Sequence, residues 1–113
     1  MSRKTVKQAI TAANLPSAHM AFPEGSAPDL PWCCFGLDSL SGFDADNTVF
    51  AKTKHWWIEL YQRTSDETVE SALETQIQNT FGPFNKTEVW IDSESVIQTT
   101  YTFTEIEKEN NNG

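Results

Sequence analysis

The sequence lacks several patterns that common functions require. Its longest apolar runs are only a few residues, so no segment can span a bilayer. The first residues are basic, as in a signal peptide, but the apolar stretch of a signal peptide does not follow them. It also has no C-x-x-C, H-x-x-x-H or H-E-x-x-H spacing and no phosphate-binding loop. We therefore expect no membrane segment, no secretion, and neither a zinc nor a nucleotide site.

Cysteine and histidine are scarce, with two of each. Cys33 and Cys34 are adjacent, and neighbouring strand residues point to opposite faces, so we expect two reduced thiols, one in the core and one facing out. No local pattern places a thiol beside an oriented imidazole of His19 or His55. The D-A-D-N run at 44–47 lacks the Gly and the closing Glu of a calcium loop. We expect no catalytic residue, cofactor or metal.

Basic residues are few and unevenly placed. The net charge is −8, from 8 Lys and Arg against 16 Asp and Glu. Arg3, Lys4 and Lys7 stand at the start of the chain, so the remainder is more acidic than the whole. Such a body repels nucleic-acid phosphates and anionic membranes. It favours a basic protein partner, or it serves solubility alone.

Large aromatic side chains supply the core. Four Trp, seven Phe and two Tyr accompany a hydrophobic fraction of 38%, and each aromatic can remove roughly 150–250 Å² from water. A chain of 113 residues suffices for one core. We predict one domain over residues 1–106 and a polar, disordered tail over 107–113.

Two helices are predicted from apolar spacing. Residues 3–14 form a short helix that Pro16 ends. Residues 66–81 form a longer one, in which apolar residues recur every fourth position. We expect Thr64 to cap it, with Glu67 completing a capping box, and Gly82-Pro83 to end it. The buried stripe comprises Val69, Leu73, Ile77 and Phe81.

Alternating side chains predict the strands. The expected strands are 18–22, 32–40 with a possible bulge at Gly36, 50–63, 86–92 and 96–106, with a loop over 23–31 and a turn over 41–47. The expected inward residues are Trp56, Ile58, Leu60, Thr87, Val89, Ile91, Ile97, Tyr101 and Phe103. The result is an α+β fold: a mostly antiparallel sheet of four or five strands, one long helix across a face, and a short N-terminal helix.

The outer face of the 50–63 strand carries His55, Trp57, Glu59 and Tyr61. Two interpretations are open for Trp57: it covers an edge of its own sheet, or it anchors an interface, where Trp and Tyr are enriched. Trp90 raises the same question. The interface candidates are Arg3, Lys4, Lys7, Trp57, Glu59, Tyr61, Trp90, Asp44 and Asp46.

Residues 15–106 resemble a family of phage proteins. The segments KHWWIELYQRTSDETVESALE and TEVWIDSESVIQTTYTFTEI show a strand ending in E-L-Y, a D-x-x-x-E helix start, a W-I-x-S-E turn and a final Y-x-F strand. This pattern is similar to that of small head–tail joining proteins of long-tailed bacteriophages, classed as minor capsid, tail completion or tail terminator proteins.

The resemblance implies a non-enzymatic structural subunit of the virion. Such a subunit forms a homo-oligomeric ring, a hexamer in tail terminators, that caps the tail tube and joins it to the head connector. The implied partners are the major tail tube protein and neck proteins, and DNA passes through the lumen without specific binding. The protein would occupy the host cytoplasm before assembly and the tail or neck of the virion afterwards.

Two alternatives remain open from the sequence. One is a neck protein placed a layer nearer the portal. The other belongs to a different class: a small acidic inhibitor that mimics DNA and blocks a host nucleic-acid-binding protein. A mimic should stay monomeric or dimeric and bind its basic partner with strong salt dependence, whereas a terminator should form rings.

Overall fold

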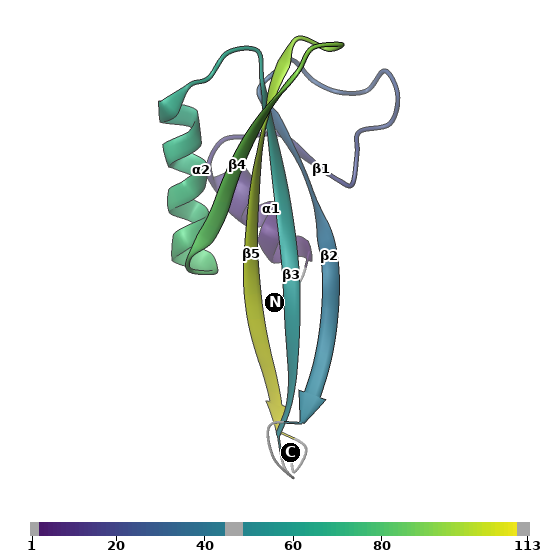
Figure 1. Ribbon diagram of the computed structural model, residues 1–113, viewed down its shortest axis with the longest axis vertical. Helices are drawn as coiled ribbons and strands as arrows, with labels where there is room; N and C mark the ends of the chain where they lie inside the picture. Colours follow the sequence, from purple (N-terminus) through teal and green to yellow (C-terminus); the bar gives the residue numbers. More distant parts are fainter. Residues whose placement is uncertain (1–2, 45–48, 111–113) are drawn as a thin grey trace.

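A computed structural model describes residues 3–44 and 49–110, and these form a five-stranded sheet with two helices on one face (Figure 1). The strand order is β1-β2-β3-β5-β4. In chain order the elements are α1 (Arg3–Ala12), β1 (Ser17–His19), β2 (Trp32–Asp44), β3 (Val49–Gln62), α2 (Glu67–Thr80), β4 (Phe84–Ile91) and β5 (Val96–Asn110).

The predicted α+β class is confirmed, and the sheet is mixed. β1 pairs in parallel with β2, and the other three pairings are antiparallel. Residues 20–31 carry the chain back to the start of β1 before β2 begins, which a parallel neighbour requires. Both helices are present and each is two residues shorter than predicted, with 10 residues in α1 and 14 in α2.

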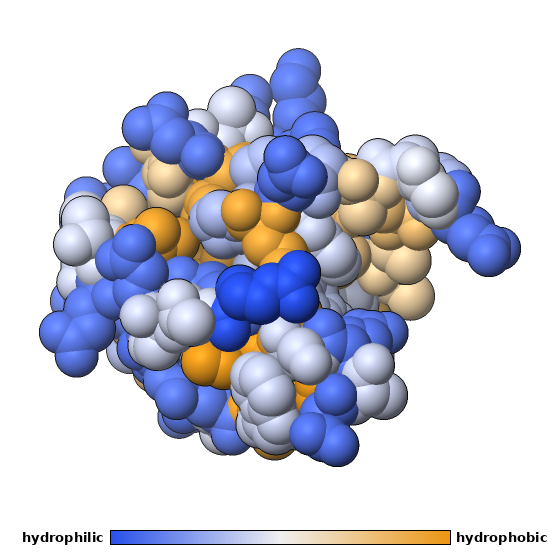
Figure 2. Space-filling view, turned by 90° about the horizontal axis from the view of Figure 1, so that it is seen from above, coloured by the Kyte–Doolittle hydropathy of each residue, from blue (hydrophilic) through white to orange (hydrophobic). Residues whose placement is uncertain are grey.

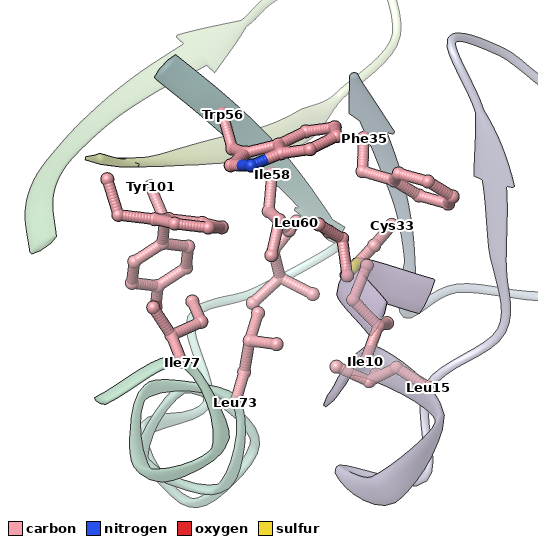
Figure 3. Packing of buried hydrophobic residues seen from close by; sticks show 12 residues of the cluster. Ile10, Leu15, Cys33, Phe35, Trp56, Ile58, Leu60, Leu73, Ile77 and Tyr101 are labelled. Atoms are coloured by element: carbon pink, nitrogen blue, oxygen red, sulfur yellow. The ribbon is translucent and has the colours of Figure 1, made fainter. Parts of the chain in front are cut away.

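The core lies between the sheet and the helix layer (Figure 3). The predicted alternation of β3 is confirmed, because Trp56, Ile58 and Leu60 are all buried. β5 adds Tyr101 and Phe103, which are buried as predicted. The helices contribute Val6, Ile10, Leu73 and Ile77, each with no exposed surface. Burial of each such side chain contributes roughly 1.5–3 kcal/mol to the free energy of unfolding.

The N-terminal end of α2 differs from the prediction. Asp66, not Thr64, is the N-cap, and its Oδ1 accepts hydrogen bonds from the backbone N–H of Thr68 at 2.9 Å and of Val69 at 3.4 Å. A carboxylate also interacts better than a hydroxyl with the positive end of the helix dipole. The other end is as predicted: Gly82, at φ +104, donates to the carbonyls of the last turn.

The predicted face assignment of β4 is wrong. Lys86 pairs with Tyr101 and Trp90 with Ile97, so Lys86, Glu88 and Trp90 share the face that carries the helices. The alternating residues Thr87, Val89 and Ile91 lie on the opposite face. The alternation predicted that the more apolar set faces inward. Because β4 is an edge strand, and edge strands can carry charges on either face, the apolar set does not mark the inward face here.

β2 and β5 are longer than predicted and form, with β3, an arm that extends beyond both helices (Figure 1). We call residues 37–44, 49–55 and 104–110 the β arm. Residues 41–44, predicted as a turn, continue β2 and pair with 50–53. Residues 107–110, predicted as tail, pair with 49–52. Residues 45–47 and 111–113 lie outside the described residues.

Gly36 has a different role from the predicted one. The register shift in β2 falls between Leu37 and Ser39, not at Gly36. A Cβ on Gly36 would lie 2.6 Å from Cζ2 of Trp57 and 2.9 Å from Sδ of Met20. The glycine therefore lets the Trp57 ring and the Met20 thioether lie directly on the backbone of β2.

Candidate functional site

In the part of the chain that the structure describes, no three His, Cys, Asp or Glu side chains are placed to hold a metal ion. Both cysteines are free and buried. Burial raises the pKa of the Cys33 thiol far above its usual range and also raises the pKa of Cys34. At neutral pH both are thiols, which are poor nucleophiles.

The outer face of the sheet carries a connected set of polar and aromatic side chains. Tyr61 Oη donates to Oε1 of Glu59 at 3.2 Å. Gln98 Nε2 donates to Tyr61 Oη at 2.8 Å and to Glu59 Oε2 at 3.0 Å. Burial, opposed by the hydrogen bond from Gln98 and reinforced by the Glu59 charge, raises the pKa of Tyr61 to about 12. The set is half-buried and its hydrogen bonds are satisfied internally.

The chain itself covers part of this face. Phe22 meets the ring of Trp32 edge-on at 5.1 Å, and Trp32 lies 4.6 Å from the ring of Tyr61. Met20 and Trp57 meet over Gly36. Trp57 therefore packs against its own sheet, as the first of its two interpretations expects, and it is half-buried. Trp90, by contrast, is 55% exposed.

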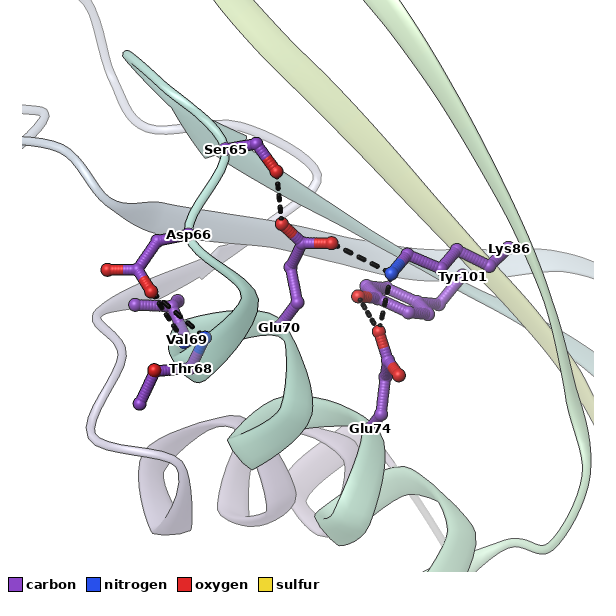
Figure 4. Close-up of polar contacts among 8 residues, drawn as sticks. All are labelled: Ser65, Asp66, Thr68, Val69, Glu70, Glu74, Lys86 and Tyr101. Atoms are coloured by element: carbon purple, nitrogen blue, oxygen red, sulfur yellow. Dashed lines mark hydrogen bonds and ion pairs between the residues drawn. The ribbon is translucent and has the colours of Figure 1, made fainter.

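The edge that includes β4 is acidic. A hollow between α2 and β4 is lined by Ser65, Glu67, Glu70, Ser71, Glu74, Lys86 and Glu88. Lys86 Nζ lies 2.8 Å from Oε1 of Glu70 and 2.7 Å from Oε2 of Glu74, and Tyr101 Oη donates to the same Glu74 oxygen at 2.8 Å (Figure 4). One cation thus faces four carboxylates. β4 also exposes Trp90 on this face of the sheet and Val89 on the opposite face.

The opposite edge is basic. Arg3 Nη1 lies 3.3 Å from Nδ1 of His19 on β1, and Lys7 Nζ donates to the Ser17 carbonyl at 2.7 Å. Arg3 and Lys7 of α1 are thereby held at the edge strand β1. Lys4 is exposed on the same helix. The three predicted basic residues are therefore brought together, while Asp44 lies at the end of β2, away from them.

Sequence reasoning missed the acidic hollow and the exposed apolar residues of the arm. Glu67, Glu70 and Glu74 recur at helical spacing, which is a signal for one charged face of α2. Leu40 and Ile106 are 51% and 61% exposed, and they stand at the ends of the strands predicted over 32–40 and 96–106. Asp46 lies outside the described residues.

The apolar surface is divided into small patches. Seen from the end formed by the 20–31 loop and the β4–β5 turn, apolar side chains gather in separate patches between hydrophilic ones (Figure 2). No helix within the described residues is long and apolar enough to cross a membrane. At this end the molecule therefore offers several small apolar surfaces.

No protein-family model matches the chain, and no curated protein matches it either.

Proposed function

We propose that this protein is a non-enzymatic structural subunit that forms a homo-oligomeric ring, of the tail terminator or tail completion type found at the head–tail junction of long-tailed phages. The phage assignment comes from the sequence resemblance. The resemblance also implies the ring, and the shape and the surfaces of the fold are consistent with it. In the proposed setting the ring caps the tail tube and meets the head connector.

One observation carries the proposal: the two edges of the sheet are open and unlike. On one side β4 exposes Val89 and Trp90. On the other, β1 covers β2 only at residues 33–35, and the remainder of β2 exposes Leu37 and Leu40. Two unlike, unfilled surfaces on one subunit are what head-to-tail closure into a ring requires. Long open strand edges are otherwise an aggregation hazard.

The shape is consistent with an interlocking subunit. The molecule measures 52 × 28 × 22 Å, and the β arm accounts for much of its length (Figure 1). The arm is stabilised by its own ion pairs, with Lys54 Nζ 2.9 Å from Glu107 and 4.0 Å from Glu105. Trp56 Nε1 donates to Glu105 Oε1 at 3.4 Å. A projection of this kind can reach a neighbouring subunit or an adjacent layer.

The DNA-mimic alternative is less well supported. A mimic needs a continuous row of unpaired carboxylates, because it replaces phosphates on a basic surface. Here Lys86 pairs with Glu70 and Glu74, and Lys54 pairs with Glu107. These internal ion pairs neutralise carboxylates of α2 and of the arm.

Negative-stain electron microscopy with light scattering of the purified full chain tests the proposal. We expect annular particles whose mass is a multiple of the subunit mass, six-fold if the resemblance extends to copy number. When the protein is mixed with isolated tail tubes, the annuli should bind at the ends of the tubes. A strict monomer at all concentrations, with salt-sensitive binding to a basic nucleic-acid-binding enzyme, would overturn the proposal in favour of the mimic.

A further inference from the structure

The charges of the helix layer are separated between the two sides of the sheet. α1 lies on the β1 side, and its cations contact that edge strand through Ser17 and His19. α2 lies on the β4 side, and its carboxylates line the hollow beside β4. β1 and β4 are the first and last strands of the sheet. The molecule thus presents a basic edge and an acidic edge in the same layer.

We infer that these edges dock on each other between copies: the basic edge of one subunit, formed by Arg3, Lys4 and Lys7, binds the acidic edge of the next, formed by Glu67 and Glu88. This inference rests on the proposed ring and names its subunit contact. Charge complementarity identifies the occupant as a second copy, because each edge supplies what the other lacks. Two like edges would instead repel.

An apolar contact accompanies the charges. Trp90 projects from β4 on the helix side of the sheet, where it shares a face with Glu88, and is 55% exposed. On α1, a shallow groove on the exposed helix surface is lined mainly by apolar atoms of Lys4, Lys7, Gln8, Thr11 and Ala12. An indole can lie on the aliphatic stems of lysines while their ammonium groups reach carboxylates. The groove and Trp90 belong to the two edges that carry opposite charge.

The contact is heterologous, so it does not close after two copies. A subunit that uses its basic edge still has its acidic edge free, and the chain of contacts ends only when a ring closes. The alternative, a two-fold dimer through equivalent edges, would oppose Arg3 to Arg3 or Glu67 to Glu67. Like charges facing each other disfavour that arrangement.

Charge reversal of each edge tests the inference. The basic-edge variant is Arg3→Glu with Lys4→Glu, and the acidic-edge variant is Glu67→Lys with Glu88→Lys. All four residues are exposed, and circular dichroism with thermal melting checks each fold. Glu24→Lys with Asp29→Lys, in the exposed 20–31 loop, makes the same net charge change as the acidic-edge variant away from both edges.

Each single-edge variant should raise the dissociation constant of assembly roughly a hundredfold, because like charges then oppose each other. The fourfold variant should assemble again, and an equimolar mixture of the two single-edge variants should form mixed rings. Trp90→Ala should weaken assembly without changing the fold. The Glu24 and Asp29 control should assemble like the wild type.

The outcomes separate this contact from the ring itself. If the wild type forms rings and both single-edge variants do so equally well, the edge contact is wrong and the ring proposal stands. Loss of assembly in both variants without recovery in the fourfold variant would also overturn the direct pairing. A wild type that stays monomeric would overturn the ring proposal, and the edge contact with it.

Discussion

Lys86 Nζ lies 2.8 Å from Oε1 of the buried Glu70 carboxylate, and this ion pair joins the edge strand β4 to α2. Burial alone would raise the pKa of Glu70, but the hydrogen bonds from Lys86 and from Ser65 outweigh it and hold the pKa below its usual range. Burial would likewise lower the pKa of Lys86, but Glu70 and Glu74 raise it well above its usual range. The pair therefore remains charged across the physiological range.

Replacing Lys86 with Met should destabilise the protein by about 1–3 kcal/mol, because it leaves a buried carboxylate without its charged partner. The free energy of unfolding from urea titration measures the effect. Arg63→Met removes an exposed cation that has only a 3.5 Å contact with the Ser95 carbonyl, and should cost much less. Equal losses in the two variants would contradict the assigned role of Lys86.

The same ion pair predicts an acid-dependent loss of stability. Because the pKa of Glu70 is lower in the folded state than its ordinary value of 4.5, its contribution is complete above pH 4.5. It is lost as the pH falls through the lower, folded-state pKa. Urea midpoints measured in steps below pH 4.5 should fall more steeply for the wild type than for Lys86→Met. Parallel pH profiles of the two proteins would show that Lys86 does not lower the pKa of Glu70.

Asp66→Ala should cost about 1 kcal/mol, because the backbone N–H groups of Thr68 and Val69 lose their acceptor. Thr64→Ala is the matched control, since Thr64 is exposed and precedes the cap by two residues. Thermal melting of both variants measures the difference. A larger loss at Thr64 than at Asp66 would restore the capping box expected from the sequence.

The elements with strong periodicity were predictable, and their ends were not. β3 and α2 bury the residues that the alternation and the fourfold spacing indicate, such as Ile58 and Leu73. The cap was misplaced because Thr64 and Asp66 both precede the helix and both can accept hydrogen bonds. Only the backbone geometry, extended at Asp66 with φ −130° and ψ 106°, decides between them.

The faces of β4 and the length of the arm could not be read from sequence for a different reason. Val89 and Ile91 are more apolar than Lys86 and Glu88, but Lys86 lies inward because Glu70 and Glu74 on α2 balance its charge. That pairing joins residues distant in sequence. In the same way, residues 107–110 read as a polar tail and become strand only because β3 pairs with them.

The sequence indicated the residues of the basic edge but not their position in the fold. Arg3, Lys4 and Lys7 stand out in the sequence because the rest of the chain is so acidic. Their position at the β1 edge depends on the parallel pairing of β1 with β2, which no local signal reveals. The edge that complements them was therefore not identified before the strand order was known.

Gly36 and Trp57 provide the sharpest test of the outer face. Gly36→Ala should destabilise the protein by about 1–3 kcal/mol, because the new Cβ would lie 2.6 Å from Cζ2 and 2.8 Å from Cε2 of the Trp57 ring and must displace it. The displaced indole should be more exposed, which shifts tryptophan fluorescence to longer wavelength. Ser41→Ala, at an exposed site on the same strand, should change neither quantity appreciably.

A double-mutant cycle with Trp57→Ala then identifies the cause. If the ring is what the added methyl group meets, Gly36→Ala should cost far less in the Trp57→Ala background, since only the flexible Met20 side chain, with Sδ at 2.9 Å, would still have to move. The two substitutions should therefore depart from additivity by more than the roughly 0.3–0.5 kcal/mol typical of independent sites. Additive costs within that margin would mean that the backbone of β2, and not the indole, is what excludes a side chain at position 36.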